Sequence, residues 1–194
     1  MKIVLVHGIF NRGAIFFWLK KYLKQAGFNC FSPSLRPCDG RYGIDYTAEQ
    51  LADKIQSFVP GDEKFCLIGF SMGAVVARYY LQNLGGYHRV THFFSIAGPH
   101  HGSYWAYLPY PSKGVRQLRP GSDFLSQLAA NQSILKKVKV YSYWTPFDLS
   151  ILPSNSSIWS IANNQKVNAW SHFSIIFNRA VKQHILTELI NDSP

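Results

Sequence analysis

The sequence predicts an α/β fold, a compact three-layer α/β/α sandwich around a mostly parallel central sheet of about six strands. Short apolar runs alternate with amphipathic runs along the 194 residues, which is the signature of strand–helix units around a parallel sheet. The chain has no internal repeats, low-complexity tracts or linker-like stretches. We therefore expect a single domain over residues 1–194, long enough to bury one large core.

The composition favours a globular protein. Hydrophobic residues make up 47% of the chain and charged residues 15%, which excludes a disordered protein. No apolar run is long enough to span a membrane, and the apolar start is too short for a signal peptide and lacks a cleavage site. Cys30, Cys38 and Cys66 are an odd number of cysteines at irregular spacing, so we expect reduced thiols and a cytoplasmic location.

The first two strands and the helix between them follow from hydrophobic periodicity. Residues 2–6 form an apolar run that predicts the first, buried strand. Apolar residues at helical spacing then predict a helix that Gly27 ends, and residues 28–31 predict the second strand. The residues at helical spacing are Phe17, Trp18, Tyr22 and Leu23.

The next helix is predicted from a start signal. Thr47-Ala48-Glu49-Gln50 has the form of a capping box, so we expect the helix to begin there and to end at Pro60-Gly61. Leu51, Ile55 and Phe58 would line its apolar face. A buried strand over residues 65–69 follows, and then a helix over residues 72–84 that Gly85-Gly86 stops.

The second half of the chain continues the alternation. We expect a strand over residues 90–97, a helix that starts near Ser122, and a strand over residues 138–143. A further strand is expected around residues 157–161, and a final helix over about residues 173–191.

The strongest chemical signal is the pentapeptide Gly69-Phe70-Ser71-Met72-Gly73. It matches G-x-S-x-G and lies between a predicted strand and a predicted helix. A serine there is forced into a strained turn that exposes its Oγ, and its neighbours two positions away must be nearly without side chains. The following helix points its amides at the place where negative charge develops. We expect Ser71 to be a nucleophile; the alternative is a purely structural glycine-rich turn.

The end of the first strand predicts an oxyanion hole. A hydrolase of this type needs two backbone N–H donors, one from the residue after the nucleophile and one from a loop after an early strand. Met72 supplies the first and Ile9 is the candidate for the second, while Gly8 lets that loop approach closely. We expect His7 to brace the loop by hydrogen bonding rather than to act in catalysis.

Most of the histidines are poor candidates for the general base. The nucleophile requires a carboxylate and then a histidine later in the chain. His88 and His92 flank a strand far from its productive end. His184 falls on the apolar stripe of the final helix, which favours a packed residue.

His172 is the preferred base. It lies in a loop just before the final helix, from which its ring can reach the serine. His100 and His101, in a loop after a strand, are the runner-up pair. For the acid we expect Asp148, which follows the strand at residues 138–143 and would hold the imidazole in the correct tautomer. Asp123 is a weaker choice because it looks like part of a helix start.

These motifs together resemble the small lipases and esterases of the α/β-hydrolase superfamily, and triacylglycerol lipases in particular. The resemblance covers nearly the whole chain. It rests on His7-Gly8-Ile9, on the pentapeptide at residues 69–73 and on the stretch at residues 97–103. In such lipases the Pro-His-x-Gly stretch borders the active site without supplying the base, which supports His172 over His100. The resemblance implies the α/β-hydrolase fold and ester hydrolysis through an acyl-enzyme, without metal or cofactor.

Two positions depart from the family pattern. The family often has His before the nucleophilic serine, where this chain has Phe70, and many members have a second Gly where this chain has Ala74. Neither change removes a catalytic group, although both alter packing around the turn.

A breaker-rich aromatic segment predicts the substrate groove. Residues 103–111 are apolar and aromatic with several prolines, so the region around residues 99–121 is expected to line an acyl groove or to form a short lid over it. A rigid loop that merely covers the core is the equal alternative. The side chains expected to contact the substrate are Phe10, Phe70, His100, Tyr104 and Trp105.

The formal net charge of +10 leaves several partners open. The basic residues are scattered and no nucleic-acid module surrounds them, so we expect no nucleic acid, and a transient contact with an anionic membrane surface is the more interesting option. We take a monomer as the default. The primary hypothesis is a serine hydrolase that cleaves carboxylic esters. The alternatives are an acyltransferase or thioesterase with the same triad, and a non-catalytic basic protein that binds lipid or nucleic acid.

Overall fold

The computed structural model describes residues 1–191, which form one six-stranded sheet. The strand order is β2-β1-β3-β4-β5-β6, and every neighbouring pair is parallel. The predicted mostly parallel sheet is thus confirmed. The strands are β1 (Lys2–Val6), β2 (Asn29–Phe31), β3 (Phe65–Phe70), β4 (Val90–Ile96), β5 (Lys139–Trp144) and β6 (Asn163–Lys166).

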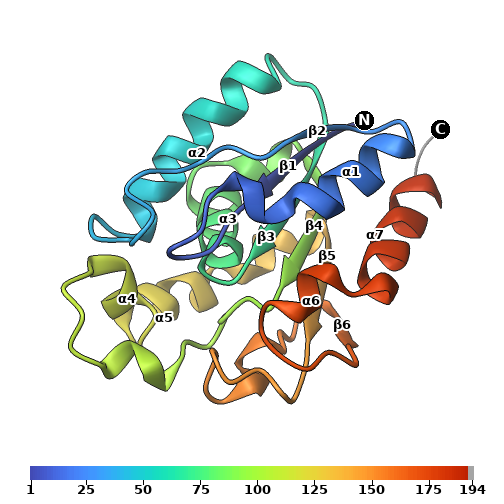
Figure 1. Cartoon of the computed structure of the whole chain (residues 1–194). Helices are drawn as coiled ribbons and strands as arrows, with labels where there is room; N and C mark the ends of the chain where they lie inside the picture. Colours follow the sequence, from blue (N-terminus) through green and yellow to red (C-terminus); the bar gives the residue numbers. More distant parts are fainter. Residues whose placement is uncertain (192–194) are drawn as a thin grey trace.

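Helices cover both faces of the sheet (Figure 1). Successive strand residues point to opposite faces, so Leu67 of β3 packs with α2 (Ile44–Phe58) and α3 (Met72–Asn83). Its neighbour Ile68 packs with α1 (Phe17–Gln25) and α7 (Arg179–Asn191) on the other side. Because both faces are buried, the central strands are continuous apolar runs rather than alternating ones. This is the predicted three-layer α/β/α sandwich.

The carboxyl ends of the central strands are aligned. The Ser71 N–H, just beyond β3, donates to the Ile96 carbonyl oxygen of β4 at 2.9 Å. The Ala97 N–H, just beyond β4, donates to the Tyr143 carbonyl oxygen of β5, also at 2.9 Å. Segments that leave these three strands therefore start side by side at one edge of the sheet, where open α/β sheets bind their ligands.

A long connection between β4 and β5 covers part of this edge. It contains a 3₁₀ helix (Tyr104–Tyr107) and two short helices, α4 (Lys113–Gln117) and α5 (Asp123–Ala130). The predicted helix start near Ser122 is confirmed, since the Ser122 hydroxyl accepts from the Leu125 N–H. The sequence did not predict α4, which has only five residues and is held by a Ser112 cap.

The start of α2 differs from the prediction. The helix begins at Ile44, three residues before the capping box expected at Thr47. Thr47 lies inside the helix, where its hydroxyl donates to the Gly43 carbonyl oxygen at 2.8 Å. A long-range contact sets the true start, because the Ile44 N–H donates to Gln117 Oε1 of α4 at 2.7 Å. Local sequence does not contain that information.

The strand expected around residues 157–161 is wrong; the sixth strand is Asn163–Lys166. Trp159, in the middle of the expected strand, is instead fully buried against the helices of the α2–α3 face. The real strand is polar throughout. It lies at the edge of the sheet, where backbone pairing with β5 requires no apolar side chains.

The single helix expected over residues 173–191 is interrupted. A short α6 (Ser174–Phe177) ends at Asn178, whose backbone is extended, and α7 begins at Arg179. Asn178 Oδ1 accepts from the Ala180 N–H at 2.9 Å and so caps α7. No helix within the described residues 1–191 is long and apolar enough to cross a membrane.

Candidate active site

Ser71 sits in the strained turn that its motif predicts. It joins β3 to α3 with φ 55° and ψ −130°, a backbone conformation that residues other than glycine rarely adopt. The glycines on either side allow this turn. A Cβ at Gly69 would lie 2.5 Å from Ala74 Cα, and one at Gly73 would lie 2.3 Å from the Val6 carbonyl oxygen. The turn therefore holds Ser71 at the N-terminus of α3, beside the end of β1.

The loop after β1 lies directly against Ser71. A Cβ at Gly8 would be 2.8 Å from Ser71 Cβ and 3.3 Å from its Oγ. Two backbone N–H groups in this region are available to a ligand. The Phe10 N–H donates to the Cys38 carbonyl oxygen at 2.8 Å, whereas within residues 1–191 we find no acceptor for the N–H of Ile9 or of Met72. This distinguishes Ile9 from Phe10 as the candidate second oxyanion donor.

His7 holds the same loop from behind. Its Nε2 accepts from the Leu35 N–H at 2.9 Å, so Nδ1 carries the proton and donates to the Gly8 carbonyl oxygen at 2.9 Å. Burial is the largest cause that lowers its pKa below the ordinary value. His7 is therefore a neutral imidazole whose two nitrogens both hydrogen-bond to the backbone and hold the loop in place, as predicted.

Asp148 and His172 form a buried pair. His172 Nδ1 donates to Asp148 Oδ2 at 2.7 Å, and both side chains are almost inaccessible to solvent. The other carboxylate oxygen, Oδ1, accepts from the backbone N–H of Ser150 at 2.9 Å and of Ile151 at 3.0 Å. Asp148 follows β5 and His172 follows β6, so both reach the edge of the sheet where Ser71 lies. The carboxylate is thus anchored on one side and orients the imidazole on the other.

Phe70 supports the imidazole rather than the substrate. We expected it to contact the substrate, but it is fully buried, and its ring lies 4.8 Å from the His172 ring, tilted by 36°. It also contacts Phe173 at 5.7 Å between ring centroids. Because Phe70 immediately precedes Ser71, this contact ties the position of the histidine to the turn that carries the serine.

A mostly apolar cavity of about 300 Å³ opens at Ser71. Ile9 and Phe10 line it from the β1 side, and Ser150 and Ile151 from the segment after β5. Most of the rest comes from the segment between β4 and β5, so the region around residues 99–121 lines a groove. Its contributions are Pro99, Ser103, Trp105, Ala106, Leu108, Tyr110, Val115 and Leu118. All eight lie within the region that we expected to line the groove, although of them only Trp105 was named as a substrate contact.

His100 does not reach this cavity. It is 2% exposed, and its Nε2 is 2.7 Å from Ser95 Oγ. Its ring stacks on Trp159 at 4.2 Å, and its carbonyl oxygen accepts from the buried Arg78 guanidinium. Burial, with nearby Arg78 and His101, lowers its pKa well below the ordinary value. His100 therefore supports the loop behind the cavity wall, and we no longer expect it to contact substrate.

Tyr104 and Trp105, both expected to contact the substrate, border different hollows. Trp105 lines the Ser71 cavity, and its Nε1 donates to the Leu149 carbonyl oxygen at 2.7 Å. Tyr104 instead borders a neighbouring hollow with His101 and Pro153. In a 3₁₀ helix successive side chains point in different directions, so one residue faces the groove and its neighbour faces away.

The sequence model of the palmitoyl protein thioesterase family matches residues 3–186. A search of curated proteins found no match.

Solved structures show the same fold at low sequence identity. The lipase BlEst2 of Bacillus licheniformis in its mature form superposes with a TM-score of 0.77 at 19% identity, over 97% of this chain and 91% of the lipase. Lipase B of Aspergillus fumigatus gives 0.83 at 15% identity, over the whole of this chain but 53% of the lipase. Polyneuridine aldehyde esterase gives 0.68 at 18%, over 97% and 98%. The chain has the α/β-hydrolase fold.

Proposed function

This chain belongs to the palmitoyl protein thioesterase family of α/β-hydrolases, and on that premise we propose that it cleaves acyl esters through a Ser71–His172–Asp148 triad. The observation that carries the proposal is the 2.7 Å contact of His172 with Asp148 at the edge of the sheet where Ser71 occupies its strained turn. A buried, anchored carboxylate and an oriented imidazole are what a serine nucleophile requires.

In the proposed mechanism, His172 Nε2 takes the proton of Ser71 Oγ as the oxygen attacks the substrate carbonyl. Asp148 keeps the other proton on Nδ1 and stabilises the imidazolium that forms. The N–H groups of Ile9 and Met72 donate to the oxyanion of the tetrahedral intermediate. His172 then protonates the leaving group, and an acyl-enzyme remains on Ser71. Water, activated by the same histidine, releases the acid and restores the serine.

The cavity at Ser71 supports an apolar acyl group as the part of the substrate held by the protein. Its walls are largely aliphatic and aromatic, and no charged side chain among residues 1–191 lines it. A buried apolar wall stabilises each methylene of an acyl chain by about 0.8 kcal/mol. We therefore propose that the chain prefers esters with an apolar acyl group over acetate esters or esters of charged acids.

Thioester hydrolysis is the second candidate, favoured by the family to which the chain belongs. The same acyl-enzyme forms from either substrate, because only the leaving group differs. An oxygen ester and a thioester with the same acyl chain distinguish the two activities by their kcat/KM. An added alcohol acceptor reveals acyl transfer if a new ester forms in place of the free acid.

We also propose that the protein is located in the cytoplasm, where the free thiols Cys30, Cys38 and Cys66 would stay reduced.

Replacing the nucleophile tests the proposal. Ser71→Ala removes the attacking oxygen, so we expect it to abolish labelling by a fluorophosphonate probe and to lower hydrolysis of a p-nitrophenyl ester by several powers of ten. Ser126→Ala, which changes an exposed serine of α5, is the matched control and should label and turn over normally. Undiminished hydrolysis by a folded Ser71→Ala variant would refute the assignment.

A further inference from the structure

Most of the exposed large apolar side chains, including the two most exposed, lie at one edge of the molecule. They lie on segments that leave the carboxyl ends of the strands, and those segments meet at the active-site edge of a parallel sheet. Phe10 follows β1, Leu108 follows β4, Leu149 follows β5 and Trp170 follows β6. Trp170 is 85% exposed and Leu149 is 79% exposed. We call the exposed apolar residues of these segments the apolar rim.

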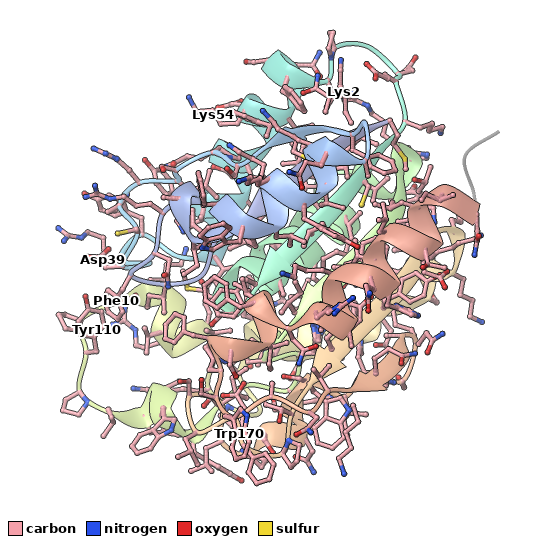
Figure 2. All side chains as sticks on the ribbon, turned by 45° about the vertical axis from the view of Figure 1, so that its right-hand side comes forward. Lys2, Phe10, Asp39, Lys54, Tyr110 and Trp170 are labelled. Atoms are coloured by element: carbon pink, nitrogen blue, oxygen red, sulfur yellow. The ribbon has the colours of Figure 1, made fainter. Side chains whose placement is uncertain are left out.

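The opposite edge of the described chain has few such side chains. Of the large apolar residues exposed within residues 1–191, Met1, Leu84 and Ile190 lie at the opposite edge, and Phe17, Trp18, Tyr46 and Phe177 lie on helices α1, α2 and α6. In Figure 2, Trp170 lies at the bottom of the molecule and Phe10 with Tyr110 at its left margin, whereas Lys2 and Lys54 lie at the top. Folding alone does not require this one-sided distribution, since scattered exposed apolar residues are the rule on soluble proteins.

The rim surrounds the mouth of the Ser71 cavity. Phe10, Trp105, Leu108 and Tyr110 are all exposed, and all four also line the cavity. Phe10 and Tyr110 make an edge-to-face contact at 5.5 Å across the opening. The entrance to the groove is therefore built from the same side chains that face outward.

Arginines lie next to the rim. Arg12, Arg36 and Arg41 line one hollow of about 440 Å³, and the bond from the Phe10 N–H to the Cys38 carbonyl oxygen places this hollow beside Phe10. In Figure 2, Asp39 of the same hollow is close to Phe10.

The charge of this hollow is positive. Asp39 is ion-paired with Arg41 at 2.6 Å. Arg12 and Arg36 form no ion pair with any of residues 1–191, so two guanidinium groups remain without a counter-charge. The hollow attracts anionic groups such as phosphates.

We propose that the apolar rim docks the protein on a membrane surface that carries anionic phospholipids, with the mouth of the Ser71 cavity against the bilayer. Tryptophan and tyrosine side chains favour the interface between headgroups and acyl chains, and arginines bind lipid phosphates. A second copy of the chain fits this face poorly, because each copy carries a net charge of +10 and would bring its arginines against those of the other. Docking does not require hydrolysis, so it can be tested independently of the catalytic proposal.

Vesicle binding by the intact chain tests this orientation. Sedimentation with vesicles of phosphatidylcholine alone, and of phosphatidylcholine with phosphatidylglycerol, should show stronger binding to the second. Leu149→Ser with Trp170→Ser removes two rim side chains that do not line the cavity, and should weaken binding at least about tenfold. Arg12→Gln with Arg36→Gln should weaken binding to the anionic vesicles roughly tenfold to thirtyfold and leave binding to phosphatidylcholine nearly unchanged.

Matched controls come from the opposite edge. Leu84→Ser with Ile190→Ser and Lys24→Gln with Lys136→Gln remove equal numbers of exposed apolar and basic side chains there. These controls should bind like the unmodified protein, and every variant should keep its activity on a soluble short-chain ester.

Two results would overturn the proposal. One is equal loss of vesicle binding in the rim variants and the opposite-edge controls, or no loss in either. The other is a dimer seen by analytical ultracentrifugation without lipid that Leu149→Ser with Trp170→Ser dissociates, because a second copy would then cover this face.

Discussion

At the scale of single residues, the environment of Asp148 determines what His172 can do. The carboxylate is 3% exposed and receives two backbone N–H groups on one oxygen and the imidazole Nδ1 on the other. Each contact limits the rotation of the carboxylate, so the imidazole is presented with its Nδ1 proton fixed and its Nε2 available. A loop histidine without this partner would sample several orientations and both tautomers.

Asp148→Asn tests this role. The amide keeps the size of the side chain and an oxygen for the backbone contacts, but it cannot stabilise the imidazolium and favours the wrong tautomer. We expect kcat to fall by about 10³–10⁴-fold, the loss typical of this change in serine hydrolases. Turnover of a p-nitrophenyl ester measures it, and circular dichroism checks folding. Asp123→Asn, at the exposed start of α5, should be nearly neutral. A comparable loss in both variants would count against Asp148 as the acid.

At the scale of elements, the break between α6 and α7 is held by one side chain. Asn178 Oδ1 accepts from the N–H groups of Ala180 and Val181, and its Nδ2 donates to the Asn168 carbonyl oxygen at 2.9 Å. The first contacts begin α7, and the last ties it to the segment that leads to His172. The break therefore fixes where the loop with the candidate base leaves the body of the protein.

Asn178→Ala should remove this cap. We expect the free energy of unfolding to fall by about 1 kcal/mol, the usual cost of losing a helix N-cap. Asn178→Asp keeps an oxygen acceptor at the same position, so it should lose clearly less. Urea denaturation followed by fluorescence compares the two. If both variants lose the same amount, the contact with Asn168 rather than the cap is what matters.

Elements with a local cause were predictable from the sequence, and those with a long-range cause were not. The turn at Ser71 depends on adjacent glycines, so its pattern is visible in five residues. The polar strand β6 could not be predicted because it pairs through its backbone and has no apolar pattern. The burial of Trp159 depends on Arg78 of α3 and on the distant His100, which local sequence does not indicate. His100 itself was misplaced for the same reason.

At the scale of the whole molecule, buried neutral histidines make stability depend on pH. Burial lowers the pKa of His100 well below its ordinary value and also lowers that of His7. In the unfolded chain both titrate near the ordinary value of about 6.5. Below that pH the unfolded state binds protons at these two histidines and the folded state does not. The free energy of unfolding therefore falls as the pH falls.

We therefore expect a lower melting temperature at pH 5 than at pH 7. Each histidine that stays neutral contributes a slope of up to about 1.4 kcal/mol per pH unit below about pH 6.5. Thermal denaturation across this range measures the slope. His100→Gln should make it shallower, even if that variant is less stable at every pH. His88→Gln, which changes an exposed side chain, should leave the slope unchanged. A slope that His100→Gln does not alter would mean that other groups cause it.

The polar character of β6 also affects how these molecules meet one another. An outer strand presents unpaired backbone groups that can recruit a strand from another chain and start a fibril. Here one edge strand, β6 (Asn163–Lys166), has only four residues and ends in a lysine. The other edge strand, β2, has only three residues. Such short edge strands offer few backbone groups with which a strand of another molecule could pair. The apolar strands most able to form amyloid, such as β3, lie in the middle of the sheet and become accessible only when the protein unfolds.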